Sequence, residues 1–174
     1  MTTDPTAPDA AARPFTIRLA VPAEYAAVGE LTVEAYANDG FIPAGSDYGD
    51  TLRAAADRAE RAELWVATDG TDLLGTVTYC RPGSFYGEIG QAHEGEFRML
   101  AVSAKARGLG VGSALTEHCI SRSRDLGYTH VVLSSADYMK PAHRIYERLG
   151  FTRVPERDWS PRPGVNLYAF SLAL

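Results

Sequence analysis

The hydrophobic and polar positions of this chain follow two periods along its length, and each period predicts one kind of element. Apolar residues spaced three or four apart predict helices at 22–38, 50–62, 111–127 and 141–150. Alternating or uniformly apolar runs predict strands at 15–19, 64–68, 73–80, 96–102, 130–136 and 151–154, with a last strand within 162–174.

This order of elements predicts a single α/β domain over residues 15–174, built on a central mixed sheet. The turn sequence at 69–72 reads DGTD and predicts a hairpin between its two flanking strands. The helix at 111–127 joins the strands at 96–102 and 130–136, and such a crossover predicts that these two strands are parallel. Residues 1–14 are rich in Pro, Ala, Thr and Asp and predict a disordered tail without the pattern of a secretory signal.

Composition narrows the classes of protein to consider. The 174 residues are 45% hydrophobic and 22% charged, with a formal net charge of −5, which is typical of a globular domain and unlike a general nucleic-acid binder. No apolar run approaches the ~20 residues of a membrane span. Cys80 and Cys119 lie far apart and match no metal-binding spacing. We therefore expect a reduced, cytoplasmic protein without a metal, a nucleic-acid partner or a membrane partner.

Three glycines at every second position stand where the helix at 111–127 begins. The first turn of a helix carries unpaired N–H groups and the positive end of the helix dipole, and glycine lets a ligand approach that backbone closely. Arg107 adds a permanent positive charge beside Gly108, Gly110 and Gly112. The spacing fits neither the dinucleotide-binding G-x-G-x-x-G motif nor the P-loop. The segment predicts a diphosphate site, and the alternative is a flexible helix start without a ligand.

Two motifs together resemble those of the GNAT family of acetyl-CoA-dependent N-acetyltransferases. The first is the pyrophosphate loop Q/R-x-x-G-x-G/A, present as RGLGVG at 107–112. The second is A-x-x-x-Y-x-x-x-G-F, present as Ala142, Tyr146, Gly150 and Phe151. The resemblance is sharp from about residue 96 to 152 and rests elsewhere on the order of the elements. Many family members carry Asn at the position of Met139, so the resemblance implies no side-chain contact for this residue.

The resemblance implies a GNAT-like fold, in which the two central parallel strands splay apart and flanking helices cover the sheet. Pantetheine would lie in the gap against the backbone of the first of these strands, and the diphosphate would lie on the amides at the start of the following helix. The cofactor-binding residues implied in this way are Leu100, Ala101, Val102, Arg107, Gly108, Leu109, Gly110, Val111, Gly112, Ser113 and Tyr146.

The implied reaction is direct attack of an amine on the acetyl thioester through a tetrahedral intermediate. Tyr146 is the candidate acid that protonates the departing thiolate, and its alternative is a packed tyrosine on an apolar helix stripe. Glu96 is the candidate base, acting directly or through water, and its alternative is a solvated glutamate at the start of a strand. His93 is a further candidate base, although a surface histidine is the simpler interpretation of its polar loop.

Three irregular segments, 37–50, 81–95 and 153–165, are expected to surround the acceptor. The first two hold carboxylates and aromatic residues that would suit a cationic amine, and the alternative is a solvated acidic surface on an acidic protein. The third adds arginines that would suit a carboxylate, so an amino acid with both charges is a further candidate. The leading hypothesis is acetylation of a small primary amine. The alternatives are acetylation of protein lysines or N-termini, and a non-catalytic acetyl-CoA-binding module. The resemblance also implies a homodimer. The charged and aromatic residues expected around the acceptor are Asp39, Phe41, Asp47, Tyr48, Asp50, Phe85, Tyr86, Glu88, Glu94, Glu96, Arg153, Arg157, Trp159 and Arg162.

Overall fold

The computed structural model describes residues 14–42 and 45–174, so the expected tail lies almost wholly outside the described residues. The strands are β1 (Thr16–Leu19), β2 (Glu63–Thr68), β3 (Leu73–Cys80), β4 (Glu94–Val102), β5 (His130–Ala136), β6 (Thr152–Arg153), β7 (Trp159–Arg162) and β8 (Val165–Ala173). The helices are α1 (Tyr25–Asn38), α2 (Tyr48–Arg53), α3 (Ala55–Arg61), α4 (Val111–Asp125) and α5 (Lys140–Arg148), with short 3-10 turns at Pro22–Glu24, Ala104–Ala106 and Pro155–Arg157.

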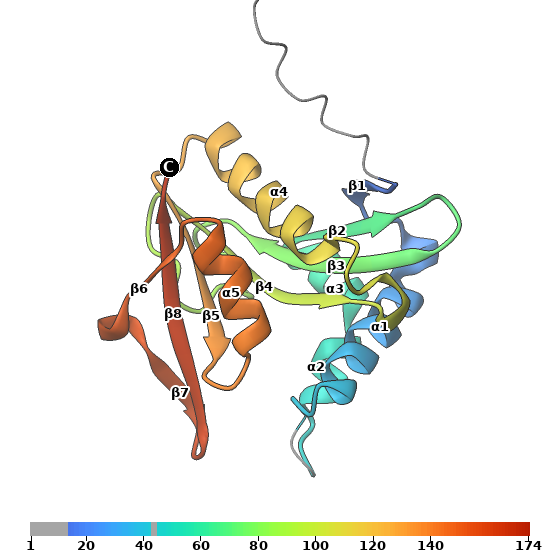
Figure 1. Cartoon of the computed structure of the whole chain (residues 1–174), viewed down its shortest axis with the longest axis horizontal. Helices are drawn as coiled ribbons and strands as arrows, with labels where there is room; N and C mark the ends of the chain where they lie inside the picture. The colour runs from blue at the N-terminus through green and yellow to red at the C-terminus, as the bar shows by residue number, and fades with distance from the viewer. Residues whose placement is uncertain (1–13, 43–44) are drawn as a thin grey trace, which may run out of the picture.

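The strands form one mixed sheet in the order β1-β2-β3-β4-β5-β8-β6, and β7 pairs with β8. The pair β4 and β5 is parallel, and the other pairs within the described residues are antiparallel. Figure 1 shows α4 and α5 on one face of this sheet and α1 to α3 on the other. The mixed sheet and the parallel crossover through α4 confirm the fold class predicted from the sequence.

The structure corrects three boundaries that the sequence predicted. The helix expected at 50–62 is two helices, because Ala54 leaves the helical conformation with φ −74° and ψ 54°. The segment expected to be irregular at 153–165 contains β7, which forms a hairpin with β8. Strand β4 begins at Glu94, two residues before the predicted start, and so Glu96 lies within the strand.

The main core lies between α4 and the sheet. The buried residues of α4 recur at helical spacing and include Val111, Ala114, Leu115 and Cys119. They pack in one cluster with buried strand residues such as Val77 of β3. This packing fixes the direction of α4, and therefore the place where its first turn meets the sheet.

The two central parallel strands separate part of the way along their length. Their pairing ends at Glu96 opposite Val132, after which β5 stays paired with β8 through Ala136. On the other side of β4 the register shifts by one residue between Thr76 and Thr78. Met99 stands at this bulge with φ 53°, a left-handed value that is rare for a side-chain-bearing residue. A bulge bends its strand and increases its twist, which accounts for the divergence of β4 and β5 seen in Figure 1.

Candidate active site

A cleft of about 750 Å³ opens where β4 and β5 separate. Its walls come from β4, from the turn before α4, from α5 and from the end of α1. All but one of the residues that the resemblance implied for the cofactor line this cleft. The exception is Leu109, which is 52% exposed to solvent. The implied residues that do line it are Leu100, Ala101, Val102, Arg107, Gly108, Gly110, Val111, Gly112, Ser113 and Tyr146.

The glycines at the start of α4 adopt a backbone conformation that other residues avoid. Gly108 has φ 81° and Gly110, the N-cap of α4, has φ 78°. The carbonyl of Gly110 accepts the amide of Ala114, at 3.0 Å between N and O. Among the described residues, none accepts a hydrogen bond from the amides of 108 or 110–113. Unpaired amides at the positive end of a helix, on the wall of a cleft, form a site for an anion such as phosphate.

Two arginines lie beside these amides. Arg107 donates from Nη2 to Oδ1 of Asp39 at 2.8 Å, which links the glycine turn to the residue after α1. Arg148, in the last turn of α5, donates from Nη2 to the hydroxyl of Ser113 at 3.1 Å and also lines the cleft. The sequence analysis missed Arg148, although its spacing of three residues from Ile145 places both on one helix face.

Tyr146 is packed in the core, as one interpretation of the sequence predicts, and it also lines the cleft, as its predicted role as an acid requires. Its ring is 5% exposed and lies 5.7–6.0 Å, between ring centroids, from the rings of Phe97, Phe151 and Phe170. Its hydroxyl forms no hydrogen bond with the described residues. Burial raises the pKa of Tyr146 well above its ordinary value, so the hydroxyl stays protonated at neutral pH. A protonated hydroxyl on a residue of the cleft wall can serve as a proton donor.

A second cavity of about 300 Å³ adjoins the cleft. Each of the three irregular segments predicted to surround the acceptor contributes to its wall, for example through Tyr48, Glu88 and Arg162. Arg98 of β4 lines both the cleft and this cavity, and the sequence analysis missed it. A charged residue within the otherwise apolar strand segment FRMLAV is the signal that marks Arg98. The other residues common to both walls are Tyr36, Phe41, Met99, Ser134, Ser135, Tyr138 and Met139.

Several of the predicted acceptor residues lie elsewhere. Phe85 is 70% exposed and packs under the guanidinium of Arg61, 4.3 Å from its carbon to the ring centroid. Tyr86 donates its hydroxyl to Asp57. Asp50 forms an exposed ion pair with Arg53. These contacts leave Asp47, Glu88 and Glu96 as the carboxylates on the wall of the second cavity.

Cys80, Cys119 and His93, the further candidate base, line neither the cleft nor the second cavity. Burial raises the pKa of the Cys119 thiol well above its ordinary value and raises that of Cys80 to about 12. Both thiols therefore stay protonated, as expected of core residues. His93 lies at a turn with φ 65°, where its carbonyl accepts the amide of Thr129 at 2.9 Å.

Within residues 14–42 and 45–174, no helix has the length and apolar character needed to cross a membrane.

Two curated relatives match more than half of the chain. Mycothiol acetyltransferase of Geodermatophilus obscurus is 37% identical over 103 residues, which make up 59% of this chain and 32% of that protein. N-acetyltransferase 8 of Mus musculus is 36% identical over 93 residues, 53% of this chain and 40% of that protein. The chain thus matches less than half the length of either relative.

Solved structures match almost the whole chain. An acetyltransferase of the GNAT family from Staphylococcus aureus Mu50 aligns with a TM-score of 0.72 over 92% of this chain and 99% of that one, at 16% identity. The protein yncA of Salmonella typhimurium, solved with its cofactor acetyl-CoA, aligns with a TM-score of 0.64 over 92% of this chain and 94% of that one, at 21% identity. The sequence model of the Acetyltransferase (GNAT) family matches residues 30–151. Because that match covers more than half of the sequence, this chain belongs to the GNAT family of acetyltransferases.

Proposed function

We propose that this protein transfers the acetyl group of acetyl-CoA to the primary amine of a small molecule. The chain's own residues fit acetyl-CoA: the unpaired amides and arginines at the start of α4 suit its diphosphate, and the apolar cleft beside β4 suits its pantetheine arm. When bound, acetyl-CoA would supply an activated acetyl thioester. The observation that carries the proposal is the second cavity, which adjoins this cleft and shares Arg98 and Met99 with it.

The walls of the second cavity favour a small acceptor over a protein chain. A volume of about 300 Å³ lies at the lower end of the range for sites that bind small molecules. Glu88 on the wall is followed by a segment that Arg157 holds, by donating to the Glu94 carboxylate at 2.8 and 3.1 Å and to the carbonyl of Ile89. The β7–β8 hairpin contributes Arg162, which donates from Nη1 to the hydroxyl of Ser46 at 3.0 Å. Contacts that hold the segments around a small cavity favour a small acceptor over an extended peptide.

The proposed chemistry is direct transfer without a covalent enzyme intermediate. The neutral amine attacks the thioester carbonyl, the resulting tetrahedral intermediate loses its carbon–sulfur bond, and Tyr146 donates its hydroxyl proton toward the departing sulfur. The reference pKa of a tyrosine is about 10 against about 8.5 for a thiol, so the donation must be driven by position in the cleft. Backbone amides along Leu100–Val102 are proposed to polarise the carbonyl.

The charges around the second cavity guide the choice of acceptors to test. Asp47 and Glu88 would attract an ammonium group, whereas Arg162 has a serine hydroxyl as its partner and would attract a carboxylate. A panel should therefore hold simple amines, polyamines and amino acids, with CoA release followed by a thiol reagent. Turnover of a free amine at rates above the hydrolysis background supports the proposal.

Two other outcomes of the same panel would replace it. Acetylation of peptides with inert free amines would support a protein acetyltransferase. Tight binding of acetyl-CoA with no acceptor turned over would support a non-catalytic binding module.

The ion pair between Asp39 and Arg107 gives a prediction for cofactor affinity. Replacing Asp39 with Asn removes a carboxylate from the cleft wall and frees Arg107 to meet a phosphate, so we expect acetyl-CoA to bind about two- to fivefold more tightly at low salt. Calorimetric titration at 20 mM and 300 mM salt measures this, and the gain should shrink at high salt. Weaker binding by the variant would instead mean that Asp39 holds Arg107 in its working position.

A further inference from the structure

The carboxylate of Glu96, the base expected from the sequence, accepts hydrogen bonds from backbone amides of a neighbouring segment. The side chain is 3% exposed, and its oxygens accept the amides of Glu88 at 3.0 Å, Ile89 at 3.3 Å and Gly90 at 2.9 Å. A Cβ on Gly90 would lie 2.9 Å from Oε2 of Glu96, so a side chain at this position would displace the carboxylate from its backbone partners. A carboxylate enclosed by several backbone N–H groups orders the loop that supplies them.

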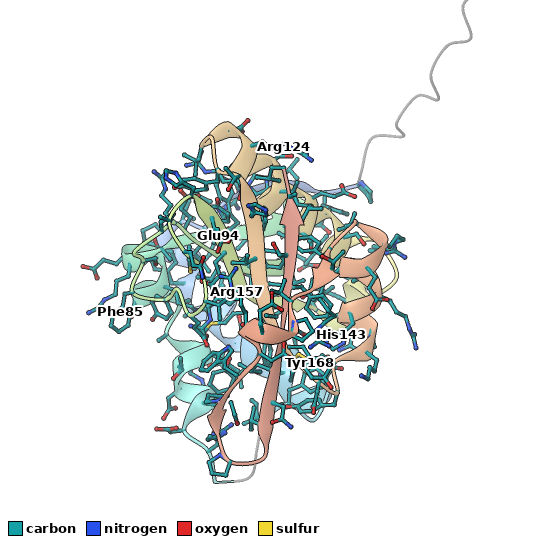
Figure 2. The ribbon with its side chains drawn as sticks, turned by 90° about the vertical axis from the view of Figure 1, so that its left-hand side faces the viewer. Phe85, Glu94, Arg124, His143, Arg157 and Tyr168 are labelled. Carbon is teal, nitrogen blue, oxygen red and sulfur yellow. The ribbon has the colours of Figure 1, made fainter. Side chains whose placement is uncertain are left out.

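Contacts from the other side hold the same segment. Glu94 accepts the amide of Gln91 at 2.9 Å, and Arg157 bridges Glu94 and the carbonyl of Ile89. Figure 2 shows Glu94 and Arg157 turned toward each other from two different segments of the chain. The backbone that carries Glu88 is therefore fixed by Glu96 on one side and by the Glu94–Arg157 pair on the other.

Glu88 presents the carboxylate that reaches the second cavity from this fixed segment. It forms an ion pair with Arg98, the residue that lines both the cleft and the second cavity, and its side chain is 18% exposed. Burial raises the pKa of Glu88 above its ordinary value, and Arg98 opposes that rise only in part. This carboxylate lies beside the junction of the cleft and the second cavity, where it can accept a proton from a bound ammonium group.

We infer that Glu88 accepts the proton of the substrate ammonium, and that Glu96 is a positioning residue that fixes the backbone of Glu88. The inference rests on the proposed transfer to an amine. In the step, a nitrogen–hydrogen bond breaks and an oxygen–hydrogen bond forms on Glu88, which frees the nitrogen lone pair for attack. After the attack the nitrogen loses a second proton, and Tyr146 gives its own proton to the departing sulfur. The second proton from nitrogen passes to Tyr146, directly or through water, and restores its hydroxyl. Glu88 passes the first proton to water, so one proton in total is released.

Three variants separate the two glutamates. In Glu88→Gln the carbonyl oxygen of the amide still accepts from Arg98, but the proton acceptor is lost, so kcat/KM should fall about 100-fold and its dependence on pH should weaken. Glu96→Gln and Gly90→Ala both disturb the anchoring of residues 88–90, and the second leaves both carboxylates in place. Both should lower kcat by a smaller factor than Glu88→Gln does and should speed amide hydrogen exchange at 88–90. In both, kcat/KM should still decrease at acid pH, because Glu88 is still present. Glu30→Gln, at an exposed ion pair with Arg53, is the control.

The opposite pattern would overturn the inference. If Glu96→Gln abolishes the pH dependence while Gly90→Ala and Glu88→Gln behave like the wild type, Glu96 is the base. A readout without turnover keeps this test apart from that of the proposed function: the carboxyl carbon of Glu88, followed by NMR in ¹³C-labelled protein, should titrate above the ordinary value of about 4.3. A midpoint at or below that value contradicts the inference, whether or not an acceptor is known. Absence of turnover in the wild-type protein contradicts only the proposed function.

Discussion

Replacing Tyr146 with phenylalanine should lower kcat for acetyl transfer about 100-fold while changing the affinity for acetyl-CoA by less than about twofold. The ring keeps its packing against Phe97 and Phe170, and only the hydroxyl is lost. Since that hydroxyl forms no hydrogen bond with the described residues, its removal leaves none of their polar groups without a partner. Steady-state rates and calorimetric titration separate the two effects.

Tyr79→Phe is the matched control. Its hydroxyl is also buried, but it is hydrogen-bonded to Ser123 at 2.7 Å and lies outside both cavity walls. Loss of this bond should reduce the free energy of unfolding by about 1 kcal/mol and leave kcat unchanged. If Tyr146→Phe lowered stability and left kcat intact, Tyr146 would be a core residue and not the proton donor.

Replacing Gly110 with alanine should weaken acetyl-CoA binding about tenfold or more. A residue with a side chain is strained by about 1–2 kcal/mol at φ 78°, so the turn will shift and the amides at 110–113 will lose their common direction. A Cβ at Gly110 meets no atom within 4 Å, so steric overlap within the protein does not contribute. Titration of the variant with acetyl-CoA measures the effect.

Gly127→Ala is the matched control, because it introduces a similar backbone strain at the other end of the same helix. Gly127 has φ 74° and open space at its Cβ position, but it lies outside the cleft wall. This variant should lose similar stability and bind acetyl-CoA like the wild type. Equal loss of affinity in both variants would indicate that general destabilisation, and not the phosphate-binding turn, is responsible.

The segments best predicted from the sequence are those in which local pattern and local structure coincide. The helix at 111–127 and the hairpin at 69–72 follow from periodicity and turn residues alone. The break at Ala54 does not, because the surrounding alanines favour a continuous helix. In the structure the buried guanidinium of Arg58 donates to the carbonyl of Leu52 at 2.6 Å and to the hydroxyl of Thr78 at 3.1 Å. This tertiary contact satisfies a carbonyl that a continuous helix would have used itself.

In the candidate site, too, some residues could be located from the sequence and others could not. The glycine turn and Tyr146 stand in short motifs, so the sequence located them, while their roles stay predictions. The relation between Glu88 and Glu96 depends on how an irregular segment folds back onto a strand, which no period or spacing encodes. Strand β7 was hidden by Pro161 and Pro163, because proline argues against a strand unless it lies at an edge. The homodimer, the cytoplasmic location and a small primary amine as the acceptor stay predictions.

The proposed function depends on a diphosphate bound by the free amides at the start of α4, and an NMR titration of ¹⁵N-labelled protein with acetyl-CoA tests this binding most directly. The amide resonances of Gly108, Gly110, Val111, Gly112 and Ser113 should shift downfield together and saturate at one equivalent, while that of Gly127 stays in place. Saturable binding that leaves these five resonances unmoved would contradict this site for the diphosphate.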